Sequence, residues 1–254
     1  MYTYAAKVDV GVSEEQNDDR ALVSSILLTD GEISGKIEKQ EIVAAICDGV
    51  GGLAQGYRAA MTTLERISHL NKTGISIEQI QTAIEESNIR VRNIKSIENL
   101  HNAMMSTIAG IYADGDRFIV FNAGDSRVYR FRFKYIMQLS KDHSLVQDLI
   151  DLGEITPEEA KTHEKKNVIN KCIGYEESVN ARIMDMSGDF SEGDILMICS
   201  DGISDVLNDQ DIRDIVIEHK QDEELKDCCI KIYEKAIEKG SLDNLSVILL
   251  RKEQ

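Results

Sequence analysis

The stretch IVAAICDGVGG, residues 42–52, decides how the rest of the chain is interpreted. It begins as a short apolar run with β-branched residues and ends at an acid, Asp48, which a glycine-rich turn follows. Short apolar runs bounded by turn residues are typical of buried strands. We therefore predict a buried strand that carries the Asp48 carboxylate at the edge of the core. The glycines free the backbone to bend, so that their carbonyls become available as ligands beside the acid.

The same pattern recurs at two further places. Residues 194–202, DILMICSDG, form another apolar run that ends at Asp201, and Asp243 stands just before the apolar run 245–250. A single Asp-Gly pair most often marks only a turn, so the prediction depends on the joint occurrence of these acids. Three strand-end carboxylates that share one rim would bind a hard cation, because magnesium and manganese prefer oxygen ligands.

Length and charge limit the classes of function. The chain has 254 residues, of which 42% are hydrophobic and 29% charged, and it contains one proline and no low-complexity tract. This composition predicts one domain spanning residues 1–254. The net charge of −16 disfavours nucleic acid and anionic lipid as partners, because both repel an acidic surface.

The cysteines and the apolar runs predict a cytoplasmic protein. Five cysteines occur without a CxxC pair, and two of them lie inside apolar runs, so we expect all of them to be reduced. The N-terminal residues lack a signal-peptide pattern, and no apolar run is long enough to cross a membrane.

The order of elements favours helices packed outside a sheet sandwich, because two consecutive helices between groups of strands do not fit a βαβ alternation. Capping boxes at Ser76 and Thr156 mark two helix starts. Strands are expected at 2–11, 21–28, 42–47, 106–112, 118–122, 128–133, 135–139, 194–199 and 245–251. Helices are expected at 55–70, after Ser76, between Ser144 and Gly153, after Thr156, and at 209–219 and 222–239.

As an ordered set, the motifs resemble the metal-dependent serine/threonine protein phosphatases of type 2C (PPM), in particular their compact bacterial members. The resemblance implies an α+β fold: a four-layer α-β-β-α sandwich of two antiparallel sheets, flanked by pairs of antiparallel helices. It also implies that residues 141–171 are a small helical flap beside the active site. The matching segments are 17–19, 48–52, 122–127, 139–144, 199–202 with Asp205, and 243–244.

The resemblance assigns a dinuclear manganese or magnesium centre to the strand-end acids. Asp48 would bridge the two ions, and the Gly49 carbonyl would bind the second of them. Asp201 and Asp243 would complete the protein ligands of the first ion, so these two acids and Asp48 would be the catalytic residues. Two ions about 3.5–4 Å apart would activate a water molecule for in-line attack on the phosphorus of phosphoserine or phosphothreonine.

Four further acids would serve the metals more loosely. Asp18 and Asp19 would hold water on the ions or ligate them directly. Asp125, with Asp201 and Asp205, would match the third-metal site of bacterial relatives.

One departure from the family pattern leaves the function open. Relatives carry an arginine, which holds the substrate phosphate, at the position of Glu14. The leading prediction is a monomeric cytoplasmic phosphatase that acts on phosphoproteins, the targets of a bacterial serine/threonine kinase. The alternative is a weakly active or silent signalling module that binds a phosphoprotein or a regulatory partner, and a phosphatase for small phosphoesters is a third reading. Arg20 or Lys171 would replace the missing arginine if Glu14 points to solvent.

Overall fold

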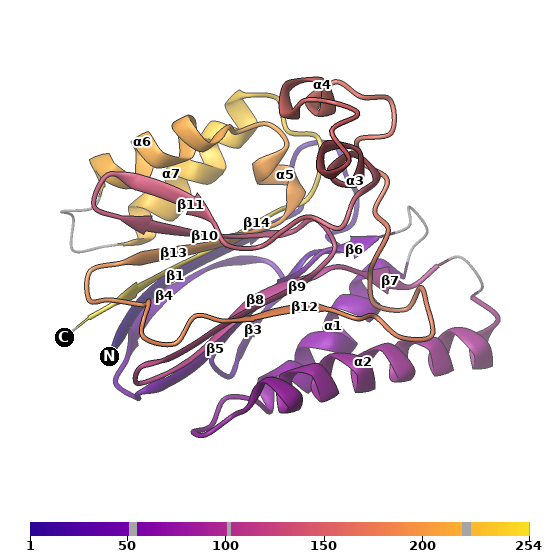
Figure 1. Ribbon diagram of the computed structural model, residues 1–254, viewed down its shortest axis with the longest axis horizontal. Helices are drawn as coiled ribbons and strands as arrows, with labels where there is room; N and C mark the ends of the chain where they lie inside the picture. Colours follow the sequence, from indigo (N-terminus) through magenta and orange to yellow (C-terminus); the bar gives the residue numbers. More distant parts are fainter. Residues whose placement is uncertain (51–54, 101–102, 220–224, 254) are drawn as a thin grey trace.

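Two antiparallel sheets form the centre of the computed structural model, which describes residues 1–50, 55–100, 103–219 and 225–253 (Figure 1). Sheet A has the strand order β11 (Tyr135–Gln138), β10 (Arg127–Arg132), β13 (Ile195–Cys199), β14 (Leu245–Lys252), β1 (Tyr2–Asp9) and β4 (Gly31–Ile37). Sheet B has the order β12 (Arg182–Asp185), β9 (Arg117–Ala123), β8 (Ile108–Asp114), β5 (Glu41–Cys47), β2 (Arg20–Val23) and β3 (Ile26–Leu28). A short third pair joins β6 (Gly49–Val50) to β7 (Met105–Ser106).

The strands that lead to Asp48 and Asp201 are buried on both faces. In β5, Ala44 and Ile46 pack between the two sheets, whereas Val43 packs against the helices outside sheet B. In β13, Ile198 likewise faces the core between the sheets. Burial on both faces explains why these segments read as continuous apolar runs instead of alternating ones.

Helices cover the outer face of each sheet, so that the layers run helix, sheet, sheet, helix (Figure 1). Sheet B is covered by α1 (Gly56–Ser68) and α2 (Ile77–Glu98), and sheet A by α5 (Asp201–Ser204), α6 (Asp209–Glu218) and α7 (Leu225–Glu238). The predicted capping box of α2 is confirmed: the Ser76 hydroxyl accepts the Gln79 N–H, and the Gln79 side chain accepts the Ser76 N–H. None of the described helices is long and apolar enough to span a membrane.

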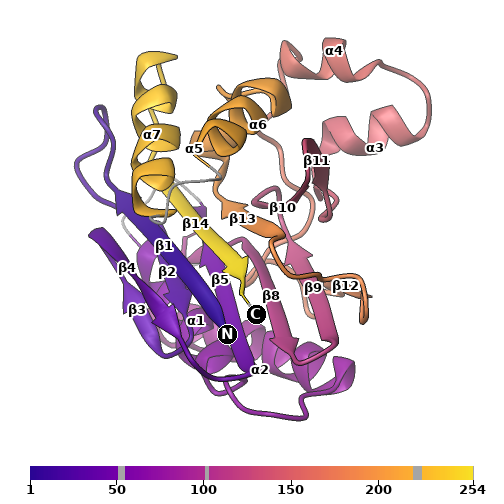
Figure 2. The same ribbon diagram turned by 90° about the vertical axis from the view of Figure 1, so that its left-hand side faces the viewer.

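Residues 141–171, called the flap here, hold the short helices α3 (Leu145–Asp151) and α4 (Pro157–Lys161) and stand apart from the two sheets (Figure 2). Both helices begin as predicted, with Ser144 and Thr156 as capping residues. No residue of α3 is buried. The flap is therefore held to the body by few apolar contacts.

Three expectations about the elements need correction. The strand expected at 21–28 is a hairpin of β2 and β3, because Ser24 adopts a left-handed conformation with φ of 59°. The turn-rich segment before the Asp48 strand contains β4, which pairs with β1 in sheet A. Strand β12 was not predicted from its short sequence. The predicted turn at 51–52 and the first residues of the helix expected at 222–239 lie outside the described residues.

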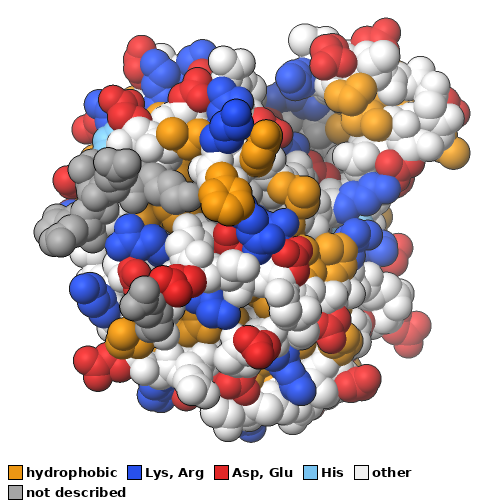
Figure 3. All heavy atoms as spheres, turned by 60° about the vertical axis from the view of Figure 1, so that its left-hand side comes forward, with side chains coloured by type: hydrophobic (Ala, Val, Ile, Leu, Met, Phe, Trp, Pro, Cys, Tyr) orange, Lys and Arg blue, Asp and Glu red, His pale blue; other side chains and the backbone are white. Residues whose placement is uncertain are grey.

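The acidic side chains are not spread evenly over the molecule. On the face drawn in Figure 3, acidic and basic side chains lie side by side, and apolar side chains form only small groups. Acidic side chains instead gather in a cleft between the ends of the two sheets, described next.

Candidate metal centre

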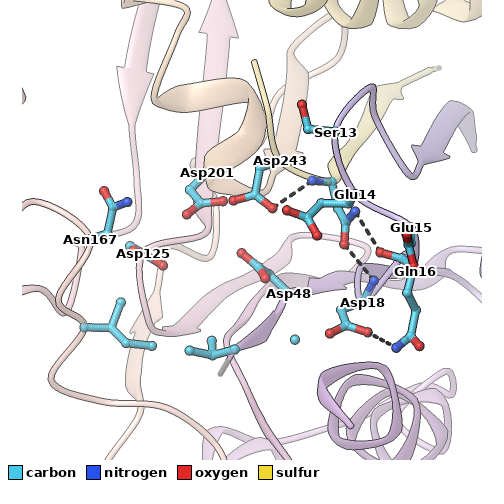
Figure 4. A pocket seen from close by; sticks show the side chains of 14 residues that line it. Ser13, Glu14, Glu15, Gln16, Asp18, Asp48, Asp125, Asn167, Asp201 and Asp243 are labelled. Atoms are coloured by element: carbon cyan, nitrogen blue, oxygen red, sulfur yellow. Dashed lines mark hydrogen bonds between the residues drawn. The ribbon is translucent and has the colours of Figure 1, made fainter. Parts of the chain in front are cut away.

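A cleft of about 760 Å³ opens where strands of both sheets end (Figure 4). Its floor carries acids from three separate elements, one wall is the loop at 13–16, and the other wall is formed by the flap. The lining residues of the described chain are Ser13, Glu14, Glu15, Gln16, Asp18, Asp48, Gly49, Val50, Asp125, Asn167, Ile169, Asp201, Asp243 and Asn244.

The three strand-end acids come together on this floor. Asp48 follows β5 of sheet B, Asp201 lies just after β13 of sheet A, and Asp243 stands just before β14. Because β13 and β14 are neighbours in sheet A, Asp201 and Asp243 reach the floor from the same side. Figure 4 shows the three carboxylates turned toward the same space.

The floor carries negative charge that no described basic side chain neutralises through an ion pair. Burial raises the pKa of Asp48 well above its usual range, and the neighbouring Asp201 raises it further. Burial, followed by the charge of Asp125, likewise raises the pKa of Asp201 well above its usual range. Neither carboxylate forms an ion pair within the described residues. Buried carboxylates are stable only when protons or cations compensate them, and a set made only of oxygen donors suits manganese or magnesium.

The described side chains as they stand do not yet form a complete metal site. Within the described residues, no three acidic, histidine or cysteine side chains lie close enough to hold an ion as they stand. Mutual repulsion between carboxylates in a partly desolvated cleft gives a physical reason for this spacing.

The backbone around Asp48 is tightly fixed. The Thr107 N–H donates to the Asp48 carbonyl at 2.8 Å, and the Asp48 N–H donates to the Thr107 hydroxyl at 3.1 Å. Gly49 pairs with Ser106 and lies so close to Gly56 that an added Cβ would be 2.4 Å from its carbonyl carbon. Only glycine fits this approach, which is a physical reason for the Asp-Gly sequence.

Asp18 and Asp19 occupy different depths. Asp18 lines the cleft, and its N–H donates to the Asn244 side-chain oxygen at 2.7 Å. Asp19 is buried below the floor, where it accepts the Ser200 hydroxyl at 2.7 Å, and burial raises its pKa to about 6. The Asn244 amide also donates to the carbonyls of Val10 and Gln16. Sequence analysis gave Asn244 no role of its own, although its place beside Asp243 was a signal.

Asp125 lines the flap side of the cleft, next to Asn167 (Figure 4). Burial, followed by the nearby Asp142, raises its pKa to about 7. The loop before it is held by His143, whose Nδ1 accepts the Gly124 N–H at 3.3 Å and whose N–H donates to the Gly124 carbonyl at 2.9 Å. His143 is thus a half-buried residue that positions the loop before Asp125.

Comparisons with known proteins point to one family. The family model described as "Protein phosphatase 2C" matches residues 186–245. The serine/threonine protein phosphatase PstP of Mycobacterium tuberculosis is 28% identical over 97% of this chain and 44% of its own length. The serine/threonine phosphatase stp of Listeria monocytogenes is 28% identical over 94% of this chain and 95% of its own.

Solved structures match along the whole fold. The crystal structure of M. tuberculosis PstP has a TM-score of 0.83 and 27% identity, covering 100% of this chain and 99% of that one. A Streptococcus agalactiae serine/threonine phosphatase has a TM-score of 0.84 and 27% identity, covering 100% of both chains. Over almost its whole length, this chain is therefore similar to bacterial phosphatases of type 2C. It spans less than half the length of the curated mycobacterial relative. A structure of the catalytic domain of a serine/threonine phosphatase called PstP, 26% identical with a TM-score of 0.79, is described as a complex with two manganese ions.

The chain has no lysine or arginine among the described residues that line its cleft. Glu14, the position at which the resemblance implies an arginine, is exposed on the wall of the cleft. The Arg20 guanidinium donates instead to the carbonyls of Asn17 and Asp19, and the Lys171 ammonium donates to a carbonyl after the flap. Neither predicted substitute for the arginine lines the cleft.

Asp205 is the other predicted ligand, besides Asp19, that does not line the cleft. Its carboxylate is paired with Lys166 of the flap at 2.6 Å. The pKa of Asp201 is nevertheless raised partly by Asp205, so the two groups interact electrostatically.

Proposed function

We propose that the chain is a metal-dependent protein serine/threonine phosphatase whose single catalytic domain spans residues 1–254. The observation that carries this proposal is the set of three carboxylates, Asp48, Asp201 and Asp243, which both sheets present to one cleft. The family relationship supports it, because matched relatives are named serine/threonine phosphatases.

In this proposal two manganese or magnesium ions bind at the floor. Asp48 would hold both ions, the Gly49 carbonyl would bind the second, and Asp201 and Asp243 would bind the first. When bound, the ions lower the pKa of water and neutralise phosphoryl oxygens, which is the chemistry that the protein alone lacks.

The other acids have supporting roles. Asp18, at the edge of the floor, holds water that surrounds the ions. Asp19 is buried, and its hydrogen bond to Ser200 supports the position of Asp201 from below. Asp125 and Asp201, with Asp205, hold a third and weaker ion on the flap side.

The substrates in this proposal are phosphoserine and phosphothreonine side chains of proteins, the targets of a bacterial serine/threonine kinase. The flap, residues 141–171, forms the wall against which such a chain would lie. The enzyme acts as a monomer in the cytoplasm, and the five cysteines, all buried and none of them in a disulfide, support a reducing compartment.

A second function has one observation in its favour. A cleft without a lysine or arginine among its described lining residues, and with Glu14 on one wall, binds a phosphate dianion less well than one with an arginine. This favours a weakly active or silent module that binds a phosphoprotein or a regulatory partner.

Turnover of p-nitrophenyl phosphate and of a phosphothreonine peptide separates the two functions. We expect hydrolysis of both with manganese, loss of activity in excess chelator, and recovery when manganese is restored. Equal turnover in chelator would contradict the metal mechanism. Absence of turnover with manganese, together with tight binding of the phosphopeptide, would identify the silent module.

A further inference from the structure

A basic side chain of the flap, Lys166, contacts one of the predicted metal ligands, Asp205. Lys166 lies in the flap after α4, and its ammonium contacts the Asp205 carboxylate at 2.6 Å. The side chains of Lys166 and Asp205 are 40% and 39% exposed. This pair joins the flap to the segment that follows α5, 39 residues further along the chain.

Asp205 belongs electrostatically to the acids on the flap side of the cleft. It raises the pKa of both Asp125 and Asp201. Arg127 acts in the opposite direction on the pKa of Asp125, but its guanidinium is held in a bidentate pair with Asp142 at 2.7–3.1 Å. Lys166 of the flap thus forms an ion pair with Asp205, one of these acids.

We propose that the Lys166 ammonium and a third divalent ion compete for the Asp205 carboxylate. In the arrangement seen here, Lys166 holds Asp205 at the outer side of the cleft, where it does not line the floor. For Asp205 to serve a metal, the ion pair must break and the flap must lose this tether. The proposal rests on the metal centre of the proposed function and adds a regulator within the chain itself.

Competition makes the flap and the third ion thermodynamically linked. Because coupling between two binding events is reciprocal, the ion weakens the flap contact by the same factor by which the contact weakens the ion. An ion pair as exposed as this one is worth roughly twofold to fivefold in an equilibrium constant. The affinity of the third, weaker site for its divalent ion should therefore rise by that factor when the Lys166 ammonium is removed.

Lys165 provides a matched control. It precedes Lys166 in the flap, is exposed, and forms no ion pair within the described residues. Lys165→Gln and Lys166→Gln remove the same charge at nearly the same place. Only the second breaks the contact with Asp205.

Manganese binding, followed by the electron paramagnetic resonance signal of the free ion, tests the proposal without relying on turnover. We expect tight sites that are equal in all proteins, and a weak site whose dissociation constant falls roughly twofold to fivefold in Lys166→Gln but not in Lys165→Gln. In the Asp205→Asn background, Lys166→Gln should no longer change the weak site. Hydrogen exchange of the Lys166 and Val168 amides should accelerate in the wild type as the weak site fills.

Results that overturn the proposed function can be told apart from results that overturn only the competition between Lys166 and the third ion. Absence of any manganese binding would overturn both this proposal and the proposed function. Tight sites without a weak site, a weak site that survives Asp205→Asn unchanged, or equal affinities in the two lysine variants would each overturn the competition alone.

Discussion

The floor and the walls of the cleft are held in different ways. On the floor, Asp48 and Asp201 follow strands that are buried on both faces, and hydrogen bonds on both sides of the Asp48 peptide fix its backbone. The walls are the loop at 13–16, whose residues are all exposed, and the flap, whose helix α3 has no buried residue. The same cleft therefore combines a rigid site with two adaptable sides.

Under the proposed function, this difference would separate two tasks, metal binding by the floor and contact with a protein substrate by the walls. Ligands to a metal pair must be placed within a fraction of an ångström, which a packed core provides. Contacts with varied protein substrates require segments of low local stability, and such segments have few buried apolar contacts. The floor should accordingly tolerate few substitutions, whereas the walls should tolerate many.

A matched pair of leucine truncations tests this contrast in stability. Leu196 is fully buried between the sheets in β13, whereas Leu152, at the end of α3 in the flap, is 72% exposed. Leu196→Ala should lower the free energy of unfolding by about 2–5 kcal/mol, because it leaves a cavity in the core. Leu152→Ala should change it by less than about 0.5 kcal/mol. Urea denaturation measures both, and similar losses would mean that the flap is an integral part of the core.

A charge reversal on the other wall should have a smaller effect. Glu14→Arg places a guanidinium where relatives hold the substrate phosphate, and should raise kcat/KM for p-nitrophenyl phosphate roughly fivefold, or about 1 kcal/mol, because the position is exposed. Most of this gain should appear in KM if the new contact is equally strong in ground and transition states. Glu15→Arg is the control for a general change in charge. Equal gains in both variants would show that no specific phosphate contact forms at residue 14.

Much of the floor could be predicted from the sequence because it depends on short-range patterns. The apolar runs before Asp48 and Asp201 indicated buried strands, and their Asp-Gly ends placed the acids at the sheet edge. The capping boxes at Ser76 and Thr156 fixed helix starts for the same reason, since capping is a contact between residues three apart.

The walls could not be predicted in the same way, because they depend on contacts between distant residues. No local pattern shows that Lys166 pairs with Asp205, or that His143 holds the Gly124 loop. Arg20 also differed from expectation: it stands beside the acids in sequence, but its guanidinium bonds to backbone carbonyls instead of lining the cleft. Side-chain direction at such positions is decided by tertiary packing.

The central claim is that the floor acids are arranged for cations and not for the stability of the metal-free protein. Burial raises the pKa of the Asp48 carboxyl, and a carboxyl group whose pKa is raised on folding destabilises the folded state above its ordinary pKa. This effect disappears as the pH falls through that ordinary pKa. Asp48→Asn removes one of these charges with almost no change in shape. The substitution should therefore have opposite effects on stability with and without metal.

Thermal unfolding of the wild type and of Asp48→Asn at pH 8, each in chelator and in excess manganese, tests this directly. In chelator, Asp48→Asn should be the more stable protein by about 0.5–2 kcal/mol. In manganese at roughly one hundred times its dissociation constant, the wild type should gain about 2.7 kcal/mol and the variant much less, so that their order reverses. A variant that is less stable than the wild type in chelator and gains as much from manganese would contradict the assignment of Asp48 as the central metal ligand.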